Sequence, residues 1–316
     1  MFNDYMFKLL LNLTYKYEFL LGFVGFFSTL WFYLAFPGPI NFWKGIPGFI
    51  NWFSVFLIGD WLSRKLGEGS ILPRKKTQTN NFKEIVIASL LMNFISDLTG
   101  SWLLKLWYYP LFDRPWVYLF LLAPIGYILF GLILFVFYRF FKHHWDKKVK
   151  PGRMSKNQKI TYLLAIHVQL LVGFWGIYQS FIYYFNFVLV NNISWYKFDQ
   201  HISASVNISY FALLWFSLFW IFEYLAFTLK KETLTRDLIR KNFIPLAAIL
   251  AASLACIILV EFANSPFQVW IFTNWPYQHI GLLKIPVAAY LLWPTQYLLL
   301  LSIVRLIDKN NSENVW

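Results

Sequence analysis

Four carboxylates stand inside or at the ends of strongly apolar runs: Asp60, Asp97, Glu223 and Glu261. An ionised side chain at the centre of a membrane span costs about 2.5–3.5 kcal/mol on insertion scales. Each acid therefore needs a partner, a hydrated cavity or a proton. A protonated carboxyl in such a place could act as a general acid, and aromatic faces beside it could stabilise a cationic intermediate. These four residues are the catalytic candidates.

The surroundings of the acids suggest different roles. Asp60 is followed four residues later by Arg64, on the same face of a helix, so a local ion pair at the cytoplasmic interface is the simpler interpretation. Glu223 has only apolar and aromatic neighbours at the corresponding spacings, with Trp220 and Tyr224 beside it. Its partner must come from another helix or from a ligand, which makes it the better functional candidate; a structural interhelical hydrogen bond is the alternative.

Asp97 and Glu261 each share a helical face with an amide side chain. Asn93 precedes Asp97 by four residues, and Asn264 follows Glu261 by three. A polar stripe that ends in an acid predicts a face turned towards the interior of the bundle. The alternative is that both acids lie close enough to the outer interface to be hydrated and idle.

Several other polar, aromatic and proline residues lie within the apolar runs. His167 is a binding candidate, although a lone polar group of this kind is more often a hydrogen-bond partner between helices. Proline can kink a helix and so open a cavity. The candidate substrate-binding residues are Asn93, Asn264, His167, Trp220, Tyr224, Pro124 and Pro294.

The sequence predicts no cofactor and no metal. It has no glycine-rich nucleotide loop, no H-E-x-x-H motif and a single cysteine, Cys256. Asp199, His201 and His279 occur in connecting segments, but their spacing matches no ligand motif.

The composition is that of a membrane protein. The chain of 316 residues is 59% hydrophobic and only 14% charged, with a mean hydropathy of +0.51. Its apolar runs are continuous rather than alternating, which favours helices over a barrel. The net charge is +13, and the basic residues behind it lie in a few connecting segments. This distribution is typical of residues that orient a protein in the membrane, and it does not indicate nucleic-acid binding. The expected partners are the lipid bilayer and a hydrophobic small molecule, and the oligomeric state stays open.

Eight transmembrane helices are expected in this all-α polytopic membrane protein. The predicted spans are 17–36, 48–66, 83–103, 115–140, 160–188, 208–229, 243–263 and 285–306. With this count, 23 of the 28 Lys and Arg residues fall on one side of the membrane, so both termini are expected to be cytoplasmic. The expected location of the protein is the cell membrane. The first span has no cleavage site and is expected to be a signal anchor, preceded by an amphipathic interfacial segment over 1–16.

Tryptophans gather in the segments that this count places outside. Trp107, Trp270 and Trp275 are among them. Because Trp is enriched where a membrane meets water, they are expected to be interfacial anchors rather than parts of a site.

The two halves of the chain resemble each other. Asp60-Trp61-Leu62 corresponds to Glu223-Tyr224-Leu225, and Asp97 corresponds to Glu261. Since each half holds an even number of spans, the pattern predicts two parallel four-helix repeats, 17–146 and 160–306. A basic cytoplasmic linker, 147–159, joins them, and a cytoplasmic tail covers 307–316. Chance is the alternative, since apolar sequences align easily.

The acid, Trp and Pro composition around Glu261 and Trp275-Pro276-Tyr277 resembles that of carotenoid-modifying enzymes of the lycopene-cyclase type. The resemblance implies an isoprenoid substrate, but the four-span repeat departs from that group. Three functions are consistent with the sequence as a whole. The first is an intramembrane acidic and aromatic site for a hydrophobic or lipid-like molecule, of which an isoprenoid is one class. Acid/base catalysis is the chemistry that such a site could perform. The second is a secondary, proton-coupled transporter, and the third is a non-catalytic assembly partner.

Overall fold

The computed structural model describes residues 2–36, 42–65, 70–72, 76–110, 122–146, 154–194, 206–267 and 270–308. It is almost entirely helical. The long helices are α1 (Phe2–Ala35), α2 (Phe42–Lys65), α3 (Lys76–Ser96), α5 (Ala123–Asp146), α6 (Lys156–Val190), α7 (Ile208–Thr228), α9 (Ile244–Phe267) and α10 (Val287–Ile307). A short helix, α8 (Leu234–Ile239), follows α7, and a π-helix, η1 (Asp97–Leu103), continues α3.

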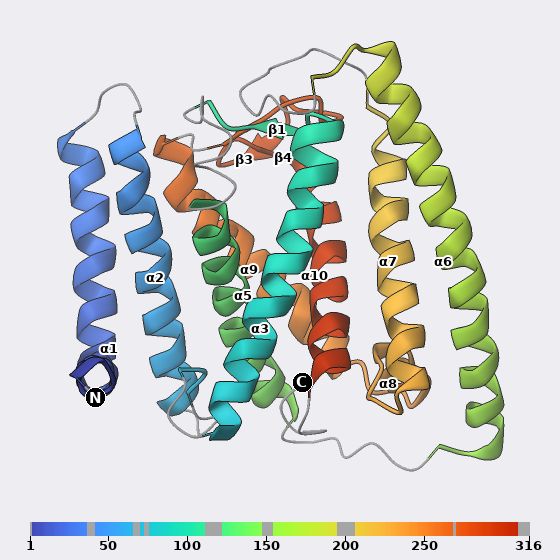
Figure 1. The fold of residues 1–316 in the computed structure, drawn as a ribbon, viewed down its shortest axis with the longest axis horizontal. Helices are drawn as coiled ribbons and strands as arrows, with labels where there is room; N and C mark the ends of the chain where they lie inside the picture. Colours follow the sequence, from blue (N-terminus) through green and yellow to red (C-terminus); the bar gives the residue numbers. More distant parts are fainter. Residues whose placement is uncertain are drawn as a thin grey trace.

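Each predicted span overlaps one of these long helices. Within the described residues, α3 with η1, α5, α6, α7, α9 and α10 are six helices that are long and apolar enough to cross a membrane. The fold is therefore that of an all-α, multi-pass membrane protein. A non-helical backbone conformation at Tyr17 interrupts α1 where the predicted interfacial segment meets the first span, and in Figure 1 the part before it is seen nearly end-on.

Two helix pairs flank a central group (Figure 1). α1 packs along α2 at one end of the molecule, and α6 packs along α7 at the other. Between them, α5 packs against α9, α2 and α3, while α10 packs against α7, α9 and α3. The core lies among α3, α5, α9 and α10 and includes buried side chains of α2 and α7. By contrast, α6 exposes large apolar side chains such as Leu171 and Phe174, as a helix facing lipid would.

Glycine allows both flanking pairs to pack closely. A Cβ atom at Gly22 of α1 would lie 2.9 Å from the carbonyl oxygen of Ser54 in α2. A Cβ atom at Gly173 of α6 would lie 3.1 Å from the carbonyl oxygen of Ser217 in α7. Small residues let helix backbones approach each other in a membrane, so each glycine sets the distance within its pair.

We expect Gly173→Leu to force α6 away from α7. Overpacking of a close contact costs about 1–3 kcal/mol, so the melting temperature in detergent should fall. Leu171→Ile on the same helix is the control, because Leu171 is 70% exposed and faces away from α7. Equal melting temperatures for the two variants in scanning fluorimetry would contradict the packing.

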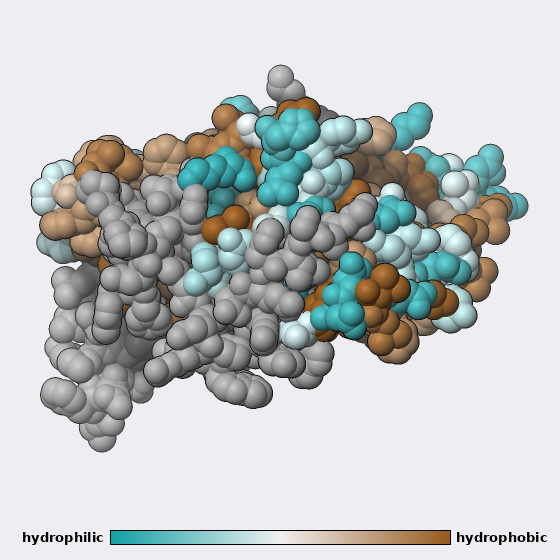
Figure 2. Space-filling view, turned by 90° about the horizontal axis from the view of Figure 1, so that it is seen from above, coloured by the Kyte–Doolittle hydropathy of each residue, from teal (hydrophilic) through white to brown (hydrophobic). Residues whose placement is uncertain are grey.

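Among the described residues, four short strands lie at one end of the bundle. β1 (Trp107–Tyr108) pairs antiparallel with β2 (Ile271–Phe272), with Trp107 opposite Phe272 and Tyr108 opposite Ile271. β3 (Gly281–Leu282) pairs with β4 (Ile285–Pro286) just before α10. Seen from this end, the described residues present hydrophilic side chains near the middle of the face, and hydrophilic and hydrophobic side chains are interspersed towards the right-hand side of the view (Figure 2). The strands thus tie the segment after α3 to the segment after α9.

Candidate functional site

Asp97 lies at the point where α3 becomes the π-helix, and it is 3% exposed. Its Oδ1 atom accepts hydrogen bonds from Trp107 Nε1 at 3.0 Å and from the Tyr109 hydroxyl at 2.7 Å. Its Oδ2 atom accepts one from the Tyr127 hydroxyl of α5. π-helical turns often occur at functional sites, and this one carries a carboxylate that three aromatic donors hold in place.

Gly100 makes room for one of these donors. A Cβ atom at Gly100 would lie 1.9 Å from Trp107 Cη2, so any side chain there would collide with the indole ring. The backbone N–H of Leu106 also donates to the carbonyl oxygen of Gly100 at 2.7 Å. The glycine therefore allows the connection to fold back over the π-helix and bring Trp107 to Asp97.

A central cavity of about 90 Å³ lies beside Asp97. Its wall is mainly aromatic, with rings from α2, α5, α10 and the strands, and its polar residues include Asn93, Ser96 and Gln296. Asp97 contributes a carboxylate, and none of the described residues that line the cavity is Lys, Arg or His. The aromatic side chains include Trp52, Trp107, Phe130, Trp270, Trp293 and Tyr297. Such a cavity suits an apolar molecule that is oriented by a few polar contacts.

Glu261 of α9 has a similar environment. It is 1% exposed and accepts hydrogen bonds from Asn264 Nδ2 and Trp270 Nε1, both at 2.9 Å. These residues line a second cavity of about 300 Å³, together with Gln278 and Lys284. Trp270 lines both cavities, so the two cavities are neighbours.

The interfacial anchor prediction is wrong for these tryptophans. The indoles of Trp107 and Trp270 each donate to a buried acid. Trp275 is 4% exposed, and its Nε1 atom donates to the carbonyl oxygen of Leu106 at 2.8 Å. Their N–H groups bond within the protein because the strand pair folds this connection inward over the ends of α3 and α9.

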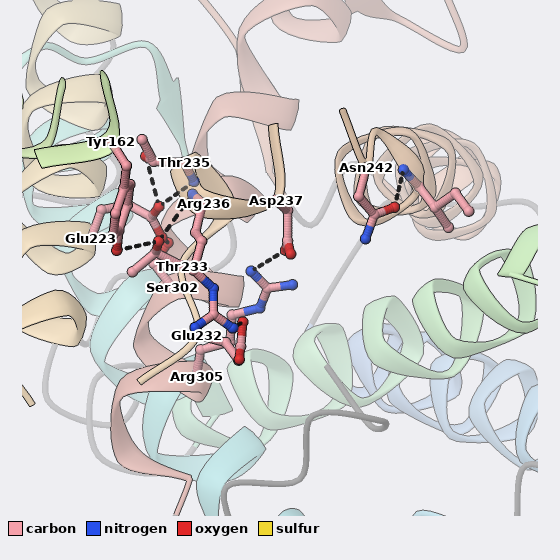
Figure 3. Close-up of polar contacts among 11 residues, drawn as sticks. Tyr162, Glu223, Glu232, Thr233, Thr235, Arg236, Asp237, Asn242, Ser302 and Arg305 are labelled. Carbon is pink, nitrogen blue, oxygen red and sulfur yellow. Dashed lines mark hydrogen bonds and ion pairs between the residues drawn. The ribbon is translucent and has the colours of Figure 1, made fainter. Parts of the chain in front are cut away.

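Glu223 lies near the C-terminal end of α7, at the end of the bundle away from the strands (Figure 1). It is fully buried where α7, α8 and α10 meet (Figure 3). Its Oε2 atom accepts from the Thr235 backbone N–H at 2.8 Å and from the Thr235 hydroxyl at 2.9 Å, and its Oε1 atom accepts from the Ser302 hydroxyl at 2.9 Å. Nearby, Arg305 of α10 forms an ion pair of 3.0 Å with Asp237 of α8. Glu223 thus holds the connection after α7 against α10.

Asp60 holds the connection after α2 in the same manner. The backbone N–H of Ile71 donates to its Oδ1 atom at 2.6 Å, and the Ser70 hydroxyl donates to its Oδ2 atom. Arg64, which the spacing offered as its partner, forms an ion pair with Glu18 of α1. Arg64 thus contacts α1, whose Glu18 also forms a side-chain hydrogen bond with Asp60, in addition to the bonds from the connection after α2.

The remaining candidates divide between the cavities and the flanking helices. Asn93 lines the central cavity and Asn264 the second one, as the polar stripes predict. Pro124 lies in the first turn of α5 as described, and Pro294 lies inside α10 between the cavity residues Trp293 and Gln296. The candidates Asp97, Asn93, Glu261 and Asn264 are thus brought to neighbouring cavities.

His167, Trp220 and Tyr224 line neither cavity. His167 is exposed on α6, where its Nδ1 atom contacts the carbonyl oxygen of Leu163 at 2.7 Å and its ring meets Tyr224 edge-on. Trp220 packs against Phe216 of its own helix. A binding role for these three residues stays a prediction.

Trp52 and Gln296 line the central cavity but are not among the candidates predicted from the sequence, although the sequence contains a signal for each. Gln296 is a polar side chain within an apolar run. Trp52 begins Trp-Phe-Ser-x-Phe-x-Ile over 52–58, and the same pattern begins at Trp215 over 215–221. The shared pattern includes the serines whose carbonyl oxygens meet Gly22 and Gly173.

Taken together, the site joins a buried carboxylate, a hydrogen-bonding amide and many aromatic faces. No group of three or more His, Cys, Asp or Glu side chains within the described ranges could hold a metal ion. Three residues in connecting segments were considered as metal ligands from the sequence. Two of them, Asp199 and His201, lie outside the described residues. No family model, curated protein or solved structure matches this chain.

Proposed function

We propose that the chain is a cell-membrane protein of eight spans whose central cavity binds a hydrophobic or lipid-like molecule. The observation that carries the proposal is the cavity itself, in which aromatic rings surround Asp97, Asn93 and Gln296 inside a bundle with apolar outer faces. The rings take the apolar part of the molecule, and the polar side chains orient its polar group.

The proposed architecture is two four-helix repeats about an axis along the membrane normal. Equating α1, α2, α3 and α5 with α6, α7, α9 and α10 makes the packing of α1 on α2 equivalent to that of α6 on α7. It likewise makes the packing of α5 on α9 equivalent to that of α10 on α3. Contacts that exchange in this manner are expected of a two-fold axis.

Individual residues support the same axis. At an offset of 163, Trp107 corresponds to Trp270, and both indoles donate to the acid of their own half. At that offset Tyr108 corresponds to Ile271, its antiparallel partner in the β1–β2 pair. A residue that pairs with its own equivalent lies beside a two-fold axis. Asp60 and Glu223, also 163 apart, both bond to the connection that follows their helix.

The proposed topology places the strands outside the cell and α8 in the cytoplasm. We expect Lys284→Cys, between β3 and β4, to react in whole cells with a maleimide that cannot cross the membrane. Lys230→Cys, between α7 and α8, should react only after the cells are opened. Both lysines are exposed, and native Cys256 is buried, so the two variants form a matched pair. The reverse pattern, or labelling of both from outside, would contradict the topology.

Filling the central cavity tests the binding proposal. Gly126 of α5 lines the cavity, and a Cβ atom there would lie 3.4 Å from Phe49 and 3.5 Å from Trp52, an ordinary contact. We expect Gly126→Leu to occupy the space and abolish retention of a small hydrophobic molecule through purification in mild detergent. Mass spectrometry of extracts measures the retained molecule, and Gly126→Ala, which leaves most of the space, is the control. Equal retention of the hydrophobic molecule by Gly126→Leu and by the wild-type protein would contradict the proposal.

Asp60 and Glu223 serve the architecture in this account. Both are buried and bonded to backbone N–H groups of the following connection, and neither lines the central or the second cavity. These contacts favour a structural role for the two acids, as expected of helix-gluing carboxylates. Asp97 and Glu261 are the two acids that line the cavities.

A further inference from the structure

Glu18 of α1 and Asp60 of α2 are two acids in direct contact. Both are 0% exposed, and their side chains form a hydrogen bond with each other. An ionised carboxylate only accepts hydrogen bonds, so a bond between two carboxyl groups requires a proton on one of them. Two buried carboxyl groups that share a site do not both ionise readily, because the like charges repel. The contact is therefore suited to hold one proton.

The other partners of the two acids favour Glu18 as the one that carries the proton. Asp60 accepts from the Ile71 backbone N–H at 2.6 Å and from the Ser70 hydroxyl, and such bonds favour the ionised form. The Oε2 atom of Glu18 accepts from Arg64, whereas its buried Oε1 atom receives no hydrogen bond from a donor among the described residues. With a proton on Oε1, Glu18 donates to Asp60 and still accepts from Arg64.

The second half of the chain holds a neutral side chain at the equivalent place. At an offset of 151, Glu18 of α1 corresponds to Gln169 of α6. The offset is set by two glycines on each helix that meet the equivalent serines of α2 and α7, namely Gly22 and Gly25 on α1 and Gly173 and Gly176 on α6. The proposed two-fold correspondence thus puts a glutamine where the first half has Glu18.

Gln169 acts as a hydrogen-bond donor towards the acid of its own half. Its Nε2 atom donates to Thr235 Oγ1 at 3.1 Å, and the Thr235 hydroxyl donates to Glu223 at 2.9 Å. A protonated glutamic acid has nearly the shape of glutamine and can likewise donate. Neutral Glu18 would thus give Asp60 directly what Gln169 gives Glu223 through Thr235.

We infer that Glu18 and Asp60 form a proton-binding site, with the proton carried by Glu18. The site goes beyond the proposed binding function, since neither acid lines the central or the second cavity. It lies at the end of the α1–α2 pair that the proposed topology places in the cytoplasm, directly after the break in α1 at Tyr17. Release of the proton to water leaves two negative charges in contact, so a rising pH loosens α1 from α2.

Other charged groups surround this end of the pair. Asp60 and Arg64 are the charged groups that act on Glu18. Lys16 lies over the ring of Tyr17, 5.2 Å from its centroid. The elements packed against α2 add further titratable groups, which are Tyr138, Arg139 and Lys142, all buried on α5, and Glu261 near the far end of α9. In the connection after α2, Glu68, Arg74 and Lys75 lie outside the described residues. The protonation of Glu18 therefore has to be measured directly.

Infrared spectroscopy of the detergent-purified full chain at neutral pH measures this proton. A protonated carboxyl group has its own C=O stretching band, which shifts in D₂O and which an ionised group lacks. We expect Glu18→Gln to lose the intensity of one carboxyl group from this band. Glu232→Gln is the matched control, because Glu232 also pairs with an arginine, Arg236, but is 25% exposed. Its replacement should leave the band unchanged.

Thermal melting gives a second measurement. Glutamine keeps both the donor and the acceptor of protonated Glu18, so Glu18→Gln should melt with the wild-type protein at neutral pH. The unfolded chain ionises this acid at neutral pH, so the folded wild-type protein binds one proton more and its stability falls as the pH rises. The melting temperature of the wild-type protein and of Glu232→Gln should therefore decrease towards alkaline pH by more than that of Glu18→Gln.

Three results would overturn the proton site. An unchanged carboxyl band in Glu18→Gln would show that Glu18 is ionised. Failure of this variant to fold at neutral pH would show that the negative charge of Glu18 is required. Loss of the wild-type band when sodium chloride replaces choline chloride would assign the place between the two acids to a metal cation.

Discussion

Gly100→Ala is expected to displace Trp107 from Asp97 and to destabilise the protein strongly. The added methyl group would lie 1.9 Å from Trp107 Cη2, a distance that forces the ring to move. Overpacking and the loss of a hydrogen bond to a buried carboxylate together cost about 3 kcal/mol. The measurement is the melting temperature in detergent, followed by scanning fluorimetry.

The control for this prediction is Gly126→Ala. Its new methyl group would make only ordinary contacts with Phe49 and Trp52, and alanine favours the helix over glycine. We therefore expect its melting temperature to equal or exceed that of the wild-type protein. A Gly100→Ala variant that is as stable as Gly126→Ala would show that Trp107 does not lie over Gly100.

Glu223→Ala is expected to cause a comparable loss of stability. The substitution leaves the Thr235 backbone N–H and the Ser302 hydroxyl without their shared acceptor, whereas the Thr235 hydroxyl keeps Gln169 Oε1 as a second one. Buried donors left unsatisfied in this manner cost about 2–4 kcal/mol in total. The melting temperature in detergent should fall, and α8 should become accessible to protease before the rest of the bundle unfolds.

Glu232→Ala provides the matched control, since Glu232 is an acid of the same connection that pairs with Arg236 and is 25% exposed. A partly exposed pair contributes about 0–1 kcal/mol, so this variant should melt close to the wild-type protein. If Glu223→Ala were no worse than Glu232→Ala, the buried network of Figure 3 would have no role in holding α8 against α10.

The helical, membrane-spanning character of the fold could be predicted from sequence because it depends on local composition. Runs of about 20 apolar residues can satisfy their backbone in lipid only as helices. The π-helix at Asp97 was not predicted. The start of the predicted span 115–140 lies outside the described residues. A π-helical turn inserts one residue into a helix without a strong compositional signal.

Part of the site was also predictable from residue type alone. Asp97 and Glu261 were selected because an acid in an apolar run is costly, and both prove to be buried beside cavities. Their partners were not selected, because Trp107 and Trp270 reach them through connections that fold back over the bundle. The same tryptophans looked like interfacial anchors, since composition places a residue near the membrane surface but does not say which way its side chain turns.

The most direct test of the central claim is a cryo-electron microscopy map of the full chain, purified in mild detergent, reconstituted in a lipid nanodisc and enlarged with a rigid binding protein. We expect non-protein density in the central cavity that continues towards lipid past Gly126. The same density should be missing from the Gly126→Leu variant. A wild-type map in which the cavity is empty, or holds density that fits only water, would contradict the claim that the cavity binds a hydrophobic molecule.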